Sequence, residues 1–235
     1  MSDKKLEANR LTQLQWWDVV IISIILFSGA IWNSTQTWLT EPSEILEQGT
    51  EFTAADNWFG LVSIILELGI SWLYLRWRKF DFSQWKYRPT AKGTLLAVGI
   101  FLVMSVGMDI VSILSLGWTE ATAYVGSLGI LGVLAEIDVS LLLFSFVNGI
   151  YEEIFFLGVC TAVPKNQRAG VLCYSLVIRF AFHTYQGLAA AAGIGFVIGG
   201  LYLLFYYKRE DKNLYPYMLS HAFADVFGAG LLYLL

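Results

Sequence analysis

Residues 93–114 read GTLLAVGIFLVMSVGMDIVSIL, and this stretch decides the class of fold. It contains a single ionisable side chain, that of Asp109. An apolar α-helix of about 20 residues crosses the roughly 30 Å hydrocarbon core of a bilayer. The stretch therefore predicts a membrane-spanning helix. Further apolar stretches of similar length in the chain would predict further spans.

Similar apolar stretches recur along the whole chain. Of its 235 residues, 57% are hydrophobic and 14% are charged, whereas a soluble domain has about 25% charged residues. We predict an all-α fold, a polytopic transmembrane helix bundle that forms one domain over residues 1–235. About seven spans are expected, at residues 17–34, 58–75, 93–114, 139–163, 169–186, 188–207 and 214–235.

The loops between these spans carry Lys and Arg on one side only. Basic residues occur before the first span (Lys4, Lys5, Arg10), after the second (Arg76, Arg78, Lys79, Lys86, Arg88, Lys92), after the fourth (Lys165, Arg168) and after the sixth (Lys208, Arg209, Lys212). The loop after the first span is acidic, with Glu41, Glu44, Glu47, Glu51 and Asp56. Because cytoplasmic loops are rich in Lys and Arg, we expect a cytoplasmic N-terminus and an outer C-terminus.

Two segments could change this count of spans. Residues 121–135 are apolar, but an eighth crossing there would move the later basic loops to the outer side, so we expect a non-spanning segment. The first span follows basic residues, as a signal peptide does, but no small-residue cleavage site follows it convincingly. We therefore expect it to remain in the protein.

Composition also limits the partners. The net charge is −4, and outside the short loops there is no basic stripe that could follow a phosphate backbone, which argues against nucleic acid as the main partner. The bilayer itself is an expected partner. Cys160 and Cys173 lie in apolar stretches and are expected to be small packing residues. Gly195 and Gly199 are expected to let helices approach closely.

Ionisable residues inside predicted spans indicate function, because they are costly in a membrane. They are Glu67, Asp109, Glu152, Glu153, Arg179, His183, His221 and Asp225. Glu152 and Glu153 are adjacent, so they point about 100° apart on a helix. Two carboxylates in apolar surroundings cannot both ionise without partners. The pair therefore predicts a cation nearby. Glu67 and Asp109 are expected to be structural partners of neighbouring helices or to line a water path.

The chain has only two histidines, and both lie in apolar spans. A spacing of four places Arg179 on the face of His183, and Asp225 on the face of His221. A lone buried histidine is usually structural. Together with the glutamate pair, however, these residues could activate a water and stabilise an oxyanion. They could also bind a metal, with His183, His221 and Glu152 as the ligands.

These motifs resemble the CAAX protease and bacteriocin-processing family, also called CPBP or Abi. The family pattern is EExxxR, then FxxxH, then HxxxN or HxxxD, on separate helices of polytopic membrane proteins. Here the motifs are Glu152-Glu153 through Leu157, the segment ending at His183, and His221 to Asp225. Their order and spacing match, and the motif-bearing half covers residues 139–235.

The resemblance implies a glutamic-type intramembrane endopeptidase that needs no cofactor. Glu152 would activate the attacking water, and His183 and His221 would orient that water or stabilise the oxyanion. Asp225 would assist His221 or the oxyanion, and Glu153 would support the site. The substrate would be a peptide or protein at the membrane, such as a prenylated protein or a leader peptide. We expect the chain to lie in a bacterial plasma membrane.

The sequence departs from the family pattern at two positions. Leu157 stands in place of the family arginine, and Arg179 in place of the phenylalanine four residues before His183. We hypothesise that the exchange is reciprocal, so that Arg179 pairs with Glu153 from a neighbouring helix in the bidentate geometry that buried Arg favours. The predicted boundaries also place Glu152, His183 and His221 at different depths. The helices must therefore be offset, kinked or re-registered.

Three other functions are compatible with these residues. A non-catalytic bacteriocin-immunity or regulatory protein would keep the fold and bind a partner. A zinc-dependent protease would use the histidines, although the chain has no HExxH helix. A transporter would use the buried charges as a proton relay, but such proteins usually show inverted repeats, and none is found in the sequence.

Overall fold

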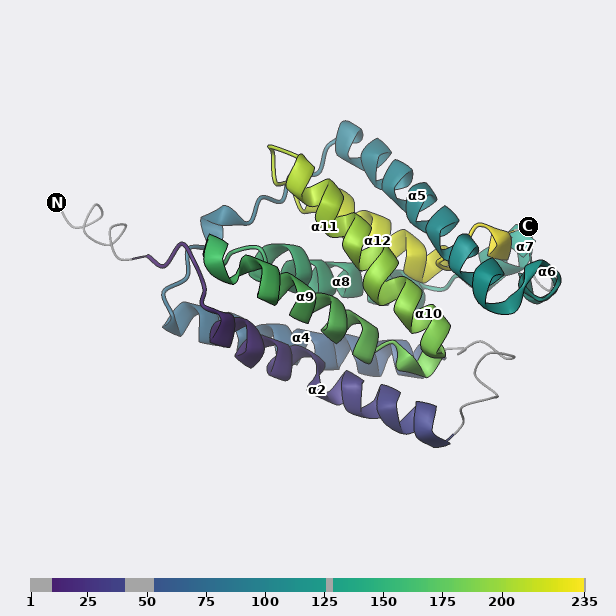
Figure 1. Ribbon diagram of the computed structural model, residues 1–235, viewed down its shortest axis with the longest axis horizontal. Helices are drawn as coiled ribbons and strands as arrows, with labels where there is room; N and C mark the ends of the chain where they lie inside the picture. Colours follow the sequence, from purple (N-terminus) through teal and green to yellow (C-terminus); the bar gives the residue numbers. More distant parts are fainter. Residues whose placement is uncertain (1–9, 41–52, 126–128, 235) are drawn as a thin grey trace.

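The computed structural model describes residues 10–40, 53–125 and 129–234, and within them the fold is all-α, as predicted (Figure 1). The helices are α2 (Trp16–Thr40), α4 (Ala54–Trp77), α5 (Ala91–Leu116), α6 (Trp118–Val125), α7 (Gly129–Glu136), α8 (Val139–Glu153), α9 (Lys165–Ala181), α10 (Leu188–Ala192), α11 (Gly199–Lys208) and α12 (Tyr215–Phe227). The π-helical turn η2 (Ile154–Val159) continues α8, and the π-helical turn η4 (Gly193–Ile198) joins α10 to α11. Short 3-10 turns are η1 (Phe82–Gln84), η3 (Thr184–Gln186) and η5 (Leu232–Leu234). Lys4, Lys5 and the acidic residues Glu41, Glu44, Glu47 and Glu51 lie outside the described residues.

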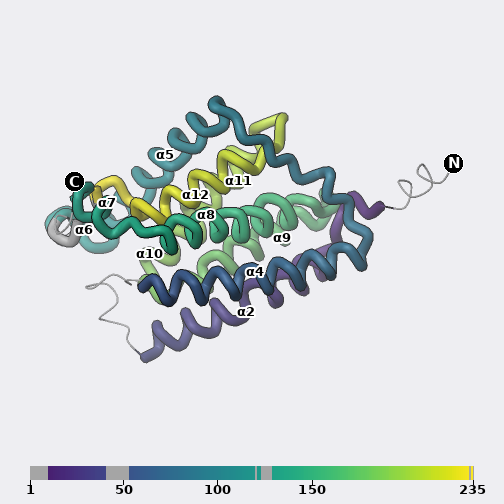
Figure 2. The backbone as a smooth tube through the Cα atoms, turned by 180° about the vertical axis from the view of Figure 1, so that it is seen from behind, coloured from purple at the N-terminus to yellow at the C-terminus, as the bar shows by residue number. Residues whose placement is uncertain are grey.

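Five helical segments of the described chain are long and apolar enough to cross a membrane: α2, α4, α5, Val139–Val159 and Leu188–Lys208. The other two predicted spans are shorter helices, α9 and α12, which pack among the long ones (Figures 1 and 2). The span predicted at residues 169–186 corresponds to Lys165–Ala181, and its later residues form a 3-10 turn instead of a helix.

The last span is shorter than predicted. It was predicted to run from residue 214 to 235, but α12 ends at Phe227, where Gly228 takes a φ of 85°. Only glycine adopts that conformation without steric cost. The following turn packs back onto α5, where the Asp109 carboxylate accepts hydrogen bonds from the backbone N–H groups of Leu231 and Leu232 at 3.1 and 3.2 Å. Asp109 is therefore a structural anchor, one of the two roles expected for it.

The described residues of the segment at 121–135 form no helix long enough to cross a membrane, which agrees with the non-spanning segment predicted for them. They lie mainly in α6 and α7, which have 8 residues each. A helix of this length extends about 12 Å, which is too short to span about 30 Å of hydrocarbon. These helices pack near the C-terminal turn η5 (Figure 1).

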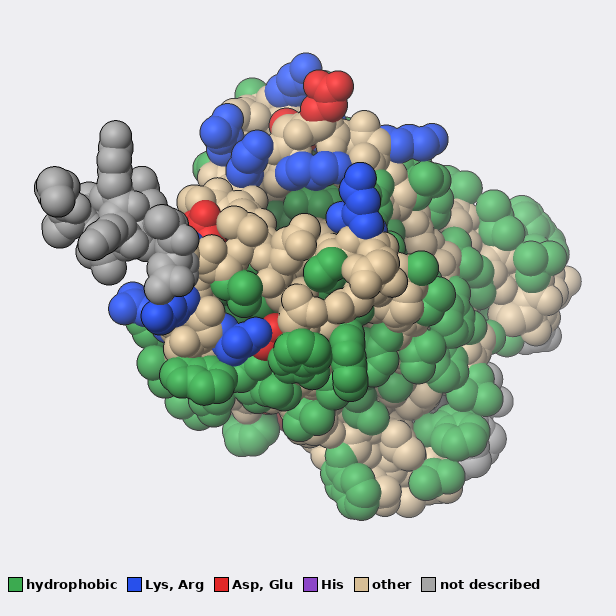
Figure 3. Space-filling model, turned by 60° about the vertical axis from the view of Figure 1, so that its left-hand side comes forward, with side chains coloured by type: hydrophobic (Ala, Val, Ile, Leu, Met, Phe, Trp, Pro, Cys, Tyr) green, Lys and Arg blue, Asp and Glu red, His purple; other side chains and the backbone are tan. Residues whose placement is uncertain are grey.

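The basic segments of the chain meet at one end of the bundle (Figure 3). Backbone hydrogen bonds join them, from Leu11 N to Lys79 O at 2.9 Å, from Leu14 N to Ala162 O at 2.7 Å and from Leu214 N to Lys86 O at 2.9 Å. This is the arrangement that alternating basic loops require. That this end faces the cytoplasm stays a prediction from the positive-inside rule.

The outer face of the bundle is apolar, as a surface in contact with lipid must be. Large hydrophobic side chains such as Phe59, Leu66 and Leu95 are exposed on it. Cys160 is buried in the core, as expected for a packing residue, whereas Cys173 is exposed on the outside of α9. The expectation for Cys173 was therefore wrong.

A buried carboxylate fixes the basic end of α2 to that of α4. Asp18 is fully buried, and its two oxygens accept hydrogen bonds from Arg78 Nε at 2.6 Å and Arg78 Nη2 at 3.0 Å. The hydroxyl of Tyr74 donates to the same carboxylate at 2.6 Å. Bidentate contacts of this kind are strong and geometrically specific.

We expect Asp18→Ala to destabilise the protein by about 3 kcal/mol, because it leaves Arg78 and Tyr74 without their buried acceptor. The measurement is the thermal unfolding midpoint in detergent. Asp211→Ala is the matched control, since it removes an Arg–carboxylate pair of the same 2.6 Å length whose carboxylate is 49% exposed. Such a surface pair contributes about 0–1 kcal/mol. Equal shifts in the two variants would contradict the anchoring role of Asp18.

Candidate active site

The site forms where α8 and α12 approach each other most closely. Gly149 lies at this crossing, and a Cβ atom there would overlap the carbonyl oxygen of Met218 and lie 3.4 Å from the Cβ of His221. The absence of a side chain at Gly149 thus lets the two backbones meet. Because Glu152 and Glu153 follow one turn later, this contact carries both carboxylates to His221.

The chain leaves regular α-helical geometry directly after the two glutamates. In η2 the N–H of Cys160 donates to the carbonyl of Phe155 at 2.9 Å, which is a bond over five residues. Such π-helical turns change the register of the helix and often occur at functional sites. A change of register, one of the three possibilities expected from the conflicting depths, therefore lies beside the site.

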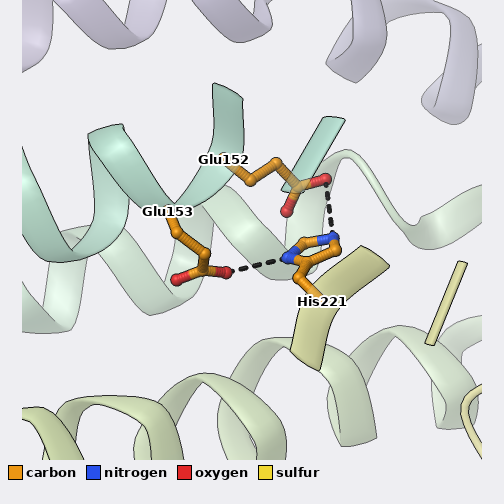
Figure 4. A group of neighbouring side chains, drawn as sticks. All are labelled: Glu152, Glu153 and His221. Carbon is orange, nitrogen blue, oxygen red and sulfur yellow. Dashed lines mark hydrogen bonds and ion pairs between the residues drawn. The ribbon is translucent and has the colours of Figure 1, made fainter. Parts of the chain in front are cut away.

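His221 lies between the carboxylates of Glu152 and Glu153 (Figure 4), and Asp225 is a third carboxylate near its ring. Its Nδ1 is 2.8 Å from Glu153 Oε1, within hydrogen-bond distance. Its Nε2 is 3.6 Å from Glu152 Oε1 and 3.6 Å from Asp225 Oδ1. Glu152, Glu153 and His221 are buried. The structure thus brings together four of the predicted site residues, which come from α8 and α12.

Arg179 supplies the permanent positive charge of this cluster. Its Nη2 lies 2.6 Å from Glu153 Oε1, and both side chains are almost fully buried. The guanidinium carbon also lies 4.0 Å from the ring centroid of Phe156, in a cation–π contact. The hypothesised pairing of Arg179 with Glu153 is therefore present, although one nitrogen makes it instead of the two expected.

Leu157 and Arg179 border the same small void between α9, η2 and α11. Gly199 lets α9 and α11 pack closely in this region, because a Cβ there would overlap Leu176 Cδ2 at 2.9 Å and would also touch Arg179 Cδ at 3.4 Å. A Cβ at Gly195 would overlap the backbone of Phe180. Both glycines have the packing role predicted for them. An arginine at 157 and one at 179 would thus reach the same region, as the reciprocal exchange requires.

Asn148 completes the cluster, and the sequence analysis missed it. Its Nδ2 donates to Asp225 Oδ2 at 3.0 Å and to Glu152 Oε1 at 3.3 Å. One neutral amide therefore connects two carboxylates on different helices. The signal was an asparagine in an apolar run, one helical turn before Glu152 and on the same face.

The hydrogen bond that the His183 ring makes is to the backbone of the preceding helix. His183 follows the end of α9, and its Nδ1 lies 2.7 Å from the carbonyl oxygen of Arg179. A carbonyl only accepts, so Nδ1 carries the proton and Nε2 of the neutral ring keeps a lone pair. In the described part of the chain, no hydrogen bond or ion pair joins His183 to the three carboxylates.

The two glutamates differ in what surrounds them. Glu153 Oε1 contacts both Arg179 and His221. Glu152 Oε1 accepts a hydrogen bond from the neutral amide of Asn148 at 3.3 Å and lies 3.6 Å from His221 Nε2. The second oxygen of each glutamate, Oε2, is buried and has no hydrogen-bond partner among the described residues. A buried polar atom of this kind needs an explanation, and an oxygen that receives a water or a substrate group is one. Glu67 lies apart from the cluster and accepts from Tyr151 Oη at 2.7 Å, which is the structural role expected for it.

A metal centre would need a different donor set from the one predicted. The side chains that bring ligand atoms within 4.8 Å of one another are Glu152, Glu153 and His221, with Glu153 in place of His183. Carboxylate and imidazole donors suit zinc. However, Glu153 Oε1 already holds the Arg179 cation at 2.6 Å, and a divalent ion on the same carboxylate would be repelled by it. The residues present therefore fit a metal poorly.

The comparisons with known proteins agree with the motifs. Residues 134–227 match the family described as type II CAAX prenyl endopeptidase Rce1-like. The resemblance inferred from the three motifs is thus confirmed over this segment, which is less than half of the chain and contains every residue of the cluster. No curated protein and no solved structure gave a significant match.

Because Leu157 and Arg179 border the same region, the reciprocal exchange can be tested by swapping the two residue types. Arg179→Leu leaves Glu153 buried without its cation, and we expect a loss of about 3–5 kcal/mol of stability. The double variant Leu157→Arg/Arg179→Leu returns an arginine to the same region and should recover most of that loss. Thermal unfolding of the wild type and both variants measures this. A double variant no more stable than Arg179→Leu would contradict the reciprocal exchange.

Proposed function

We propose that this protein is a membrane-embedded endopeptidase in which Glu152 activates a water molecule. The observation that carries the proposal is the unequal environment of the two glutamates. Glu153 Oε1 is bound to the Arg179 cation at 2.6 Å and to His221 at 2.8 Å, whereas Glu152 Oε1 accepts a longer bond, at 3.3 Å, from the neutral amide of Asn148. Glu152 also keeps a buried Oε2 that has no hydrogen-bond partner among the described residues, as Glu153 does. A general base needs such an oxygen within hydrogen-bond reach of the proton that it removes.

The proposed reaction uses the cluster in two steps. Glu152 takes a proton from water, and the hydroxide adds to the scissile carbonyl carbon, which leaves a tetrahedral oxyanion. Donors placed where this charge develops lower the barrier, and His221, whose two nitrogens both face carboxylates, supplies the donor. Glu152 then returns the proton to the leaving amine as the C–N bond breaks. The Nε2 lone pair of His183 orients the water.

The remaining groups fix this geometry. The side-chain amide of Asn148 donates to both Glu152 and Asp225 and so fixes their relative positions. The carboxylate of Glu153 contacts Nδ1 of His221 and so orients its ring. Both are positioning residues. Side chains locked by such contacts lose little freedom when the substrate binds.

The position of the site indicates the class of substrate. The carboxylates lie between helices of an apolar bundle, so the peptide must enter from the membrane or its surface. We propose that the substrate is a peptide held at the bilayer by a lipid or an apolar segment, such as a prenylated protein or a leader peptide. A soluble peptide would lack the group that brings it to this depth.

Replacing Glu152 by Gln should abolish cleavage while the fold is kept. General-base catalysis contributes about 10²–10⁴-fold, so we expect the cleavage rate to fall by at least about 100-fold. The assay follows a library of lipidated peptides with purified protein in lipid. Glu67→Gln is the matched control, because it alters a half-buried glutamate outside the cluster that accepts a hydrogen bond from Tyr151, and it should cleave normally. Undiminished cleavage by Glu152→Gln would contradict the mechanism.

The proposed mechanism needs no metal, and this sets it apart from the zinc alternative. We expect prolonged treatment with a zinc chelator to leave the cleavage rate unchanged. Metal analysis of the same active sample should show much less than one zinc per chain. Loss of cleavage that returns on adding zinc would overturn this part of the proposal and favour the Glu152, Glu153 and His221 donor set.

The non-catalytic immunity or regulatory function rests on the link of some family members to bacteriocin immunity and on Leu157 in place of the family arginine. The Arg179–Glu153 contact at 2.6 Å supplies the missing charge from the next helix. If Glu152→Gln retains the biological role of the protein in cells, the binding function would be preferred over the enzyme.

A further inference from the structure

An apolar groove lies between α5 and α11, apart from the carboxylate cluster. Its cavity measures about 280 Å³, close to the lower end of the range for small-ligand sites. The walls are apolar and include Leu96, Gly99 and Val103 from α5 and Phe205 from α11. Val103 is 47% exposed on the outer face of the bundle. The groove therefore opens on the side where lipid chains lie.

One end of the groove carries positive charge. Lys208 and Arg209 line it at the end of α11, which lies beside the start of α5 (Figures 1 and 2). Arg209 is paired with Asp211 at 2.6 Å. Lys208 is exposed and has no ion pair or hydrogen bond within the described residues. This is the end where the Lys and Arg side chains of the bundle gather (Figure 3).

A second lysine continues the α5 wall toward the same end. Lys92 lies four, seven and eleven residues before Leu96, Gly99 and Val103, which places all four on one face of the helix. Lys92 is exposed in the first turn of α5. The groove thus has an apolar length and a cationic end formed by two helices.

A buried hydroxyl in the groove lacks a partner. Tyr217 on α12 lines the cavity and is fully buried, and its Oη has no hydrogen bond within the described chain. Buried polar groups are nearly always satisfied. A ligand with a polar head near Lys208 would explain this hydroxyl, whereas a purely apolar occupant would leave it unsatisfied.

We propose that this groove binds one anionic phospholipid from the leaflet on the basic side of the membrane. Its acyl chain lies along Leu96, Gly99 and Phe205, and its phosphate lies at Lys208 and Lys92. The charge of the groove and its place at the interface favour an anionic headgroup, since basic pockets between helices on that side bind such lipids. None of the carboxylate-cluster residues lines the groove, so this lipid is distinct from the substrate.

The test measures lipid binding to delipidated protein in detergent by native mass spectrometry, with phosphatidylglycerol and phosphatidylcholine of equal chain length. One basic residue near the membrane surface contributes about 1 kcal/mol to attraction of anionic lipid, or roughly fivefold in affinity. We expect phosphatidylglycerol to bind at least about fivefold more tightly. Lys208→Gln should remove most of that preference.

A second variant fills the groove instead of changing its charge. Gly99 has open space around it, because a Cβ there would meet no atom within 4 Å. Gly99→Leu should therefore fold and reduce the binding of both lipids. Gly69→Leu is the matched control, as Gly69 on α4 is also exposed with open space around it, and it should bind as the wild type does.

Two results would overturn the proposal. Equal binding of the two lipids by the wild type would remove the case for an anionic headgroup. Phosphatidylglycerol binding that survives both Lys208→Gln and Gly99→Leu would place the lipid elsewhere. If Gly99→Leu lost its helical circular dichroism, Lys208→Gln would decide the question, because an exposed side chain can change without unfolding the protein.

Discussion

The buried ion pair between Arg179 and Glu153 is the interaction on which the site depends. Removing either ion from water costs several kcal/mol, so each charge is stable in the bundle only because the other lies beside it. Glu153 Oε1 also contacts His221 Nδ1. A single oxygen therefore joins α9 to α12 through the end of α8. The close approach of helices at Gly149 and Gly199 makes this joint possible.

The same pair separates the tasks of two chemically identical residues. Glu153 is held by a permanent cation at 2.6 Å, while Glu152 contacts the neutral amide of Asn148 at 3.3 Å and faces His221 at 3.6 Å. Environment, and not residue type, thus assigns one glutamate to structure and the other to chemistry. Similar division between neighbouring carboxylates is known wherever burial and charge differ around them. The apolar groove at the basic end adds a second, separate lipid contact to the same bundle.

Much of this arrangement could be predicted from the sequence, because the bilayer imposes simple rules. The lengths of the apolar stretches predicted the helices, and the alternation of basic and non-basic loops predicted that the basic loops lie at one end of the bundle. The Arg179–Glu153 contact was predicted because Leu157 stands in place of the family arginine and Arg179 in place of the family phenylalanine. The π-helical turn η2 could not be located, since local register depends on packing. Neither the end of α12 at Gly228 nor the amide bridge of Asn148 could be derived, because both depend on tertiary contacts. The role expected for His183 stays a prediction, and the structure adds that its ring is held by the Arg179 carbonyl.

The most direct test of this account compares the thermal stability of Glu152→Gln and Glu153→Gln in the same detergent. Glu153→Gln leaves Arg179 as an unpaired buried charge, and we predict a loss of about 3–5 kcal/mol. Glu152→Gln removes a buried carboxylate that lacks a full set of partners. It should therefore unfold at the same temperature as the wild type or above it, as is common when a strained functional group is replaced. The opposite order, with Glu152→Gln the less stable variant, would contradict the assignment of structure to Glu153 and chemistry to Glu152.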